Sequence, residues 1–126
     1  MITAAQTPSV LHGERSITYR WEIGPSTETW LGTPGTDVAE LQVHHFGHGK
    51  QFTASLHQVT VFPNGGTRCT YALAGPSWSR REPVARYSAA RLREFAGRAL
   101  AALRDTEPNA IEFAFPRAAI AEEVIS

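Results

Sequence analysis

Three of the five histidines, His44, His45 and His48, lie close together, and they are the first residues whose types and spacing suggest chemistry. Imidazole nitrogens bind zinc or copper when several converge on one point at about 2.0–2.1 Å. His44 and His45 are neighbours in a segment that alternates like a strand, so they should point to opposite faces of a sheet. His57 should lie about 13 Å from His44, four rises of roughly 3.3 Å along the paired strand. The sequence therefore predicts no metal site and favours histidines that pack or form hydrogen bonds.

The other reactive groups do not complete a catalytic motif. Cys69 could be a nucleophile if His57 activated its thiol, but the pattern of its strand places it on the core side, which predicts an inert thiol. Gly49-Lys50 lacks the rest of a phosphate-binding loop, and residues 75–79 lack the second glycine of a nucleophile elbow. We therefore expect no catalytic residue and no cofactor. A motif search leaves open an enzyme that is built from dispersed residues.

Charge is distributed unevenly, although twelve basic and twelve acidic residues cancel over the 126 residues. Residues 80–105 contain seven arginines against three acids, a net charge of +4, and residues 41–79 add two basic residues and no acid. The absence of net charge excludes a wholly basic nucleic-acid coat and an acidic tail protein. In an up-and-down sheet, the 47–50 turn and the 75–87 loop fall at the same end. The expected anion-binding residues at that end are His48, Lys50, Trp78, Arg80, Arg81 and Arg86.

Arginines beside an exposed tryptophan can bind single-stranded nucleic acid through phosphate pairing and base stacking. The alternative is that Trp78 packs beneath a helix while the arginines pair with the acidic C-terminal segment. We expect a non-enzymatic binding module that engages nucleic acid or an acidic protein surface. One alternative is a protein-interaction or inhibitor module that uses a sheet edge and the C-terminal segment. Another is a small-ligand pocket or small enzyme with proton transfer by His44, His45 or His57 and with Trp30 over the ligand.

An α+β domain over residues 16–126 must position these residues, and a flexible arm, or at most a short edge strand, should precede it over residues 1–15. Strict alternation predicts a first strand over residues 17–23. Residues 24–38 contain two prolines and three glycines, which predict a long loop around Trp30. The next two strands should form a hairpin in which residues 39–47 return as 50–62.

The hairpin register follows from the apolar pattern. If residue 47 faces residue 50, then Leu41 faces Leu56, Val43 faces Ala54 and His45 faces Phe52. The alternation slips after Leu56, which predicts a bulge near residues 57–58. The other face of the sheet should be polar with a single aromatic residue. It should show Thr18, Arg20, Gln42, His44, Phe46, Thr53, Ser55 and Thr70.

The second half of the chain completes the expected architecture. Pro63-Asn64-Gly65-Gly66 is a tight turn signal, and a fourth strand should follow over residues 67–74. After a loop over residues 75–87, Ser88 can cap an amphipathic helix that ends near Asp105. The predicted fold is a four-stranded antiparallel meander, covered on one face by this helix, with a short strand and helix as a tail over residues 111–125.

Cellular setting and assembly follow only in part from the sequence. A single cysteine cannot form an intramolecular disulfide, so we expect a reducing, cytoplasmic setting. No stretch approaches the roughly 20 apolar residues of a membrane span, so we expect no membrane partner. The C-terminal segment could complete the core of its own chain or cross to a second copy, and a homodimer is therefore a further expectation.

Overall fold

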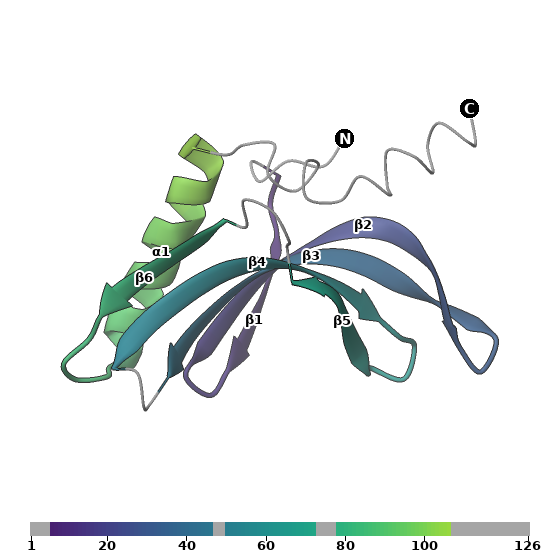
Figure 1. The fold of residues 1–126 in the computed structure, drawn as a ribbon, viewed down its shortest axis with the longest axis horizontal. Coiled ribbons are helices and arrows are strands. Elements are labelled where there is room, and N and C mark those ends of the chain that lie inside the picture. The colour runs from purple at the N-terminus through teal and green to yellow at the C-terminus, as the bar shows by residue number, and fades with distance from the viewer. Residues whose placement is uncertain (1–5, 47–49, 73–77, 107–126) are drawn as a thin grey trace.

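The structure is a computed structural model that describes residues 6–46, 50–72 and 78–106. Within these ranges the chain forms one antiparallel sheet of six strands and a single helix, so the predicted α+β class and the helix packed on the sheet are confirmed. The prediction of a four-stranded meander is wrong, because the sheet has two more strands and curls into a half-barrel. Figure 1 shows the long strands bending into an arch, with the helix packed along one arm.

The first three strands run in order along the sheet. β1 spans Ser9–Gly13, β2 spans Ser16–Trp30 and β3 spans Thr33–Phe46, and neighbouring strands pair antiparallel. The predicted loop over residues 24–38 is wrong, because β2 and β3 continue through it to a two-residue turn at Leu31-Gly32. Its two prolines fit a strand here because Pro25 borders a register shift and Pro34 lies next to the turn. Proline is tolerated at bulges and strand ends, where no ladder N–H is required.

The central hairpin has the predicted register. β4 spans Gln51–Val61, and its pairing with β3 places Leu41 opposite Leu56 and His45 opposite Phe52. Apolar side chains of both strands thereby meet on the face that the helix covers. The predicted irregularity near residues 57–58 occurs between Gln58 and Val59, in the pairing of β4 with β5, while the β3–β4 register continues without a break.

Two short strands share the outer edge of β4. β5 spans Thr67–Ala72 and pairs with the end of β4, and β6 spans Ser79–Pro83 and pairs with its beginning. The sequence predicted β5 but placed β6 inside a loop. Two buried residues bracket β6: Trp78 O accepts a hydrogen bond from Leu56 N at 3.3 Å, and Val84 N donates to Lys50 O at 2.7 Å. Burial of Trp78 and Val84 therefore holds a polar segment against the sheet.

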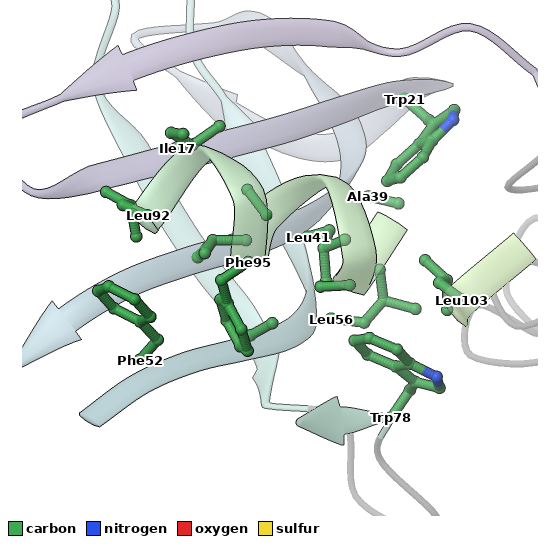
Figure 2. Close-up of a cluster of buried hydrophobic side chains, with 14 of the residues drawn as sticks. Ile17, Trp21, Ala39, Leu41, Phe52, Leu56, Trp78, Leu92, Phe95 and Leu103 are labelled. Carbon is green, nitrogen blue, oxygen red and sulfur yellow. The ribbon is translucent and has the colours of Figure 1, made fainter. Parts of the chain in front are cut away.

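The helix α1, Ala89–Thr106, begins and ends close to its predicted bounds. Ser88 caps it, since the Ser88 Oγ accepts a hydrogen bond from Arg91 N at 3.1 Å. Its apolar stripe packs on β2, β3 and β4, as Figure 2 shows for Leu92, Phe95 and Leu103 against the sheet. This face of the sheet is called the helix face below. The core on it contains Ile17, Trp21, Ala39, Leu41, Val43, Phe52, Ala54, Leu56, Trp78 and Val84, together with the helix residues.

The predicted tail over residues 111–125 lies outside the described residues, as does His48. In the part of the chain that the structure describes, no helix has both the length and the hydropathy needed to cross a membrane. Residues 9–13 of the expected N-terminal arm form β1. Three residues before β1, the Gln6 carbonyl accepts a hydrogen bond from Nε1 of the core residue Trp21 at 2.9 Å.

Candidate functional site

The face of the sheet opposite the helix carries a hydrogen-bonded polar cluster. It is called the polar face below. Cross-strand pairing and alternation place the following residues on it: Ser16, Thr18, Arg20, Glu40, Gln42, His44, Phe46, Thr53, Ser55, His57 and Arg81. The residues predicted to share this face therefore do so, except for Thr70, whose side chain lies outside the described residues.

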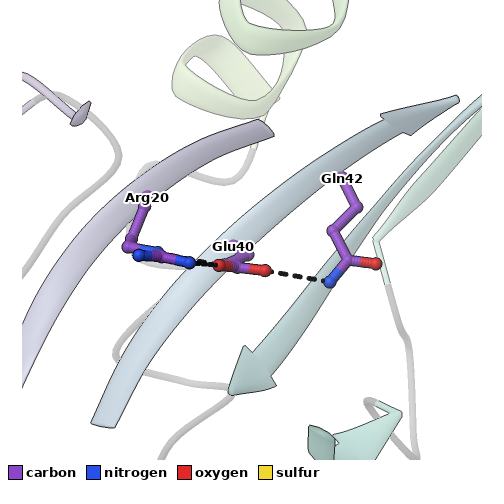
Figure 3. Close-up of polar contacts among 3 residues, drawn as sticks. All are labelled: Arg20, Glu40 and Gln42. Carbon is purple, nitrogen blue, oxygen red and sulfur yellow. Dashed lines mark hydrogen bonds and ion pairs between the residues drawn. The ribbon is translucent and has the colours of Figure 1, made fainter. Parts of the chain in front are cut away.

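Glu40 is the centre of the cluster and is only 6% exposed. Arg20 Nε and Nη2 lie 2.8 and 2.6 Å from Glu40 Oε2, and Gln42 Nε2 donates to Glu40 Oε1 at 3.0 Å. Figure 3 shows the three side chains in a line across β2 and β3. Both carboxylate oxygens are therefore occupied, which is how a buried charge is stabilised.

Ser55 and His57 form the second contact of the cluster. The Ser55 Oγ and His57 Nε2 lie 2.7 Å apart on alternate positions of β4. A serine nucleophile needs a histidine base whose second nitrogen is held by an acceptor. His57 Nδ1 is buried and has no hydrogen-bond partner among the residues that the structure describes. Both oxygens of Glu40, its cross-strand neighbour, already accept other hydrogen bonds. The pair lacks this third member of a catalytic relay, so the arrangement favours a structural role.

Burial lowers the pKa of both histidines on this face below their ordinary value of 6.5. For His57, desolvation is the largest cause, the neighbouring His44 lowers the pKa further, and Glu40 partly offsets both. For His44, desolvation is the cause. Both imidazoles are therefore favoured as neutral groups in the folded chain.

Acidification should destabilise the folded chain through His44 and His57. Both pKa values are below 6.5 in the folded chain. Between those values and about pH 6.5, the unfolded chain therefore binds more protons than the folded chain. The free energy of unfolding falls as the pH drops through this window. In urea unfolding at pH 7.5 and about 5.5, His57→Gln should lose less stability on acidification than the parent chain. Thr33→Gln, at an exposed position of β3 that does not titrate, is the control and should lose as much as the parent. Equal losses in all three proteins would contradict the assignment.

Cations and one exposed aromatic ring lie near the beginning of β4, and we call them the basic end: Lys50, Arg81 and Arg86, with the ring of Phe46 at the end of β3. Phe46 is 53% exposed, and the His44 ring stacks beside it at 5.7 Å. Arg81 lies opposite Thr53, which is also the partner of His44, so Arg81 and His44 flank the same residue on the polar face. These three cations are exposed, and none makes an ion pair within the described residues.

Arg15 lies near the same end of β3, but its side chain packs on the helix face through Tyr87. The Tyr87 ring packs 4.8 Å from the His45 ring at the end of β3, and the Arg15 guanidinium lies over Tyr87 at 4.8 Å. Arg15 also leads into β2 beside β3, where His45 N donates to its carbonyl at 3.0 Å. Phe46 was absent from the predicted site. The alternation that places Phe46 on the polar face was the signal for it, whereas nothing in the sequence places Arg15 over Tyr87.

Trp78 and Arg80 lie on the other face of β6. Trp78 is only 6% exposed and packs in the core beside Leu56 (Figure 2). This position agrees with the alternative expectation, in which Trp78 packs beneath the helix. The Arg80 guanidinium stacks over its ring at 4.7 Å and donates to Ser79 O at 2.8 Å. Trp78 therefore has no free face of the kind that base stacking requires, and Arg80 points away from Arg81.

Trp30 does not join His44 and His57. It lies at the far hairpin tip, 52% exposed, with its ring 6.2 Å from that of Phe62. The two histidines lie on the polar face of β3 and β4, while Trp30 ends β2 at the opposite end of the hairpin. The structure therefore does not bring these three predicted ligand contacts together. Among residues 6–46, 50–72 and 78–106 no three His, Cys, Asp or Glu side chains group as metal ligands.

Comparison of the chain with protein-family models, with curated proteins and with solved structures found no significant match. The functional argument therefore depends on the geometry of the basic end and of the polar face.

Proposed function

We propose that the chain binds single-stranded nucleic acid at the basic end, with a base stacked on Phe46 and phosphates contacted by Lys50, Arg81 and Arg86. The observation that carries the proposal is an aromatic ring, 53% exposed, beside cations that make no ion pair within the described residues. Exposed aromatic rings next to basic side chains are the elements that single strands use, since every base has a stacking face and every nucleotide a charge.

The distribution of arginine partners supports this location. Arg20 pairs with Glu40 within the sheet, Arg98 forms two hydrogen bonds with Glu82 at 2.8 and 2.9 Å, and Arg68 lies 3.7 Å from Glu28. These three cations are partly neutralised by the fold itself. The cations of the basic end retain charge that a phosphate chain can neutralise with release of counterions.

The role that the sequence assigned to Trp78 passes to Phe46 in this proposal. A ring that packs in the core gives no platform for a base, whereas Phe46 presents about half of its surface. Arg80 can still add to the local positive potential from the edge of the sheet. The single cysteine fits a reducing, cytoplasmic setting, which we include in the proposal.

Fluorescence anisotropy of labelled oligonucleotides tests the proposal. The purified chain should bind single strands in preference to duplexes, and its affinity should fall with salt at a log–log slope of about −0.7 per phosphate contact. Arg81→Ala should weaken binding and make that slope shallower by about 0.7. Phe46→Ala should cost about 1–3 kcal/mol of binding free energy for single strands if a base stacks there.

Two variants at the opposite end of the sheet serve as matched controls. Arg68→Ala removes another exposed arginine, and Trp30→Ala removes an aromatic side chain of nearly the same exposure, 52% against 53%. Both should bind like the parent chain. If the four variants bind equally, or if no oligonucleotide binds even at low salt, the proposal is wrong. Salt-dependent binding to an acidic protein without binding to oligonucleotides would assign the basic end to a protein partner.

A further inference from the structure

β1 forms one edge of the sheet, and it carries two exposed aliphatic side chains, one on each face. Val10 is 47% exposed and Leu11 is 39% exposed, and no strand within the described residues pairs with the outer side of β1. Val10 lies opposite Tyr19 on the helix face and Leu11 lies opposite Thr18 on the polar face. The edge therefore presents backbone donors and acceptors flanked by apolar side chains on both faces.

The two edges of the sheet differ in composition. β5 and β6 share the other edge. β6 reads Ser-Arg-Arg-Glu-Pro and β5 contains Arg68, and charged residues and proline are the features that block the addition of another strand. β1 reads Ser-Val-Leu-His-Gly and contains no Asp, Glu, Lys, Arg or Pro. The hydrogen bond from Trp21 Nε1 to Gln6 O fixes the chain just before β1, so the strand is held in an extended form. Of these two edges, only β1 lacks protection against strand addition.

We infer that β1 pairs antiparallel with β1 of a second copy of the chain, which joins the two sheets into one. One register pairs all five residues: Leu11 faces Leu11 of the second copy at the two-fold axis, Val10 faces His12, and Ser9 faces Gly13. This arrangement is self-complementary, as a two-fold interface requires. The formal net charge of zero adds no overall repulsion between copies.

A ladder of five residues is short, and it buries less than the roughly 1,200–2,000 Å² of a standard stable interface. The dimer should therefore form reversibly with concentration. Pairing at β1 leaves the polar face uncovered, and the basic end lies on or next to β3, β4 and β6, which β2 separates from β1. The inference therefore stands or fails independently of the proposed nucleic-acid binding.

Analytical ultracentrifugation over about 1 μM to 1 mM tests the pairing together with a charge swap at the two-fold axis. The weight-average mass should rise from 13.8 kDa toward twice that value. Leu11→Lys places like charges directly opposite each other, so the concentration at which half of the chains are dimeric should rise at least about tenfold. Leu11→Glu should raise it by a similar factor, for the same reason. An equimolar mixture of the two variants should associate again, because lysine then faces glutamate. Leu31→Lys, at a leucine that is 91% exposed, is the matched control and should associate like the parent.

Hydrogen exchange locates the contact within the dimer. Alternate amides of β1 already face β2, and the remaining ones should exchange more slowly at high concentration, while the amides on the outer edge of β6 should not change. A chain that stays monomeric over the whole range would overturn the inference. So would association that survives Leu11→Lys, or a mixture of the lysine and glutamate variants that fails to associate.

Discussion

Replacing Phe52 with alanine should lower the free energy of unfolding by about 3–5 kcal/mol, the cost typical of removing a buried phenylalanine ring. Phe52 is 1% exposed and is the largest of the fully buried side chains. Its ring packs at 5.4 Å from that of Phe95 on α1 and at 5.7 Å from that of His45 on β3. The substitution would therefore leave a cavity between the helix and the central hairpin, where the packed sheet can collapse only partly.

Urea unfolding of Phe52→Ala and Phe46→Ala measures the effect against a matched control. Phe46 lies on the paired strand with half of its surface exposed, so its replacement should change stability by no more than about 0.5 kcal/mol. The two phenylalanines then separate fold from function, since Phe46→Ala should affect nucleic-acid binding and Phe52→Ala should affect stability. A loss below about 1 kcal/mol for Phe52→Ala would contradict a core closed around this ring.

The central hairpin could be predicted from the sequence because its apolar residues fix the register. Shifting β4 by one residue against β3 would turn Leu56, Ala54 and Phe52 away from Leu41 and Val43, so only one pairing buries both sets. The helix was predictable for a similar reason, since its apolar residues recur every three or four positions and Ser88 provides the cap. In both elements the local pattern and the tertiary contact agree.

The elements that the sequence missed depend on contacts made elsewhere in the fold. β2 and β3 continue through a segment rich in Pro, Gly and Thr because they pair with each other, and its irregularities are absorbed by register shifts. The first four residues of β6, Ser79 to Glu82, carry three charges, which is unusual for a strand. The two charged side chains on the helix face nevertheless contact other residues there. Arg80 stacks on Trp78, and Glu82 binds Arg98 of the helix. A residue pattern cannot indicate a strand whose partners are supplied by another element.

The candidate site was predictable in location but not in detail. Charge counting placed Lys50, Arg81 and Arg86 at one end, and alternation placed His44 and Phe46 on the polar face. The orientation of Trp78 depends on burial against Leu56 and the helix, which no local feature of residues 75–87 encodes. A tryptophan among arginines can stack on a ligand or fill a core, and only the tertiary fold decides between them.

Removing the Glu40 carboxylate should cost about 2–3 kcal/mol, somewhat less than the roughly 3–5 kcal/mol of breaking a fully buried ion pair. The side chain of Glu40 is 8% exposed, and that of Arg20 is 25% exposed. Glu40→Ala would leave Arg20 within the sheet without its carboxylate and Gln42 Nε2 without its acceptor. Arg20 can recover part of its hydration, which is why the expected loss stays below the upper figure.

A double-mutant cycle over Arg20→Ala and Glu40→Ala isolates the pair. The double variant should lose about 1–2 kcal/mol less than the sum of the two single variants, because the second substitution removes a group that the first has already left unpaired. Arg98 and Glu82 provide the matched cycle on the surface, where the side chains are 61% and 37% exposed and the coupling should be about 0.2–1 kcal/mol. Replacing the buried pair together, as Arg20→Met/Glu40→Leu, should be nearly neutral, since two apolar side chains need no partner. Equal coupling energies in the two cycles would show that the sheet does not shield Glu40 from water. The Arg20–Glu40 pair would then contribute no more to stability than the exposed Arg98–Glu82 pair.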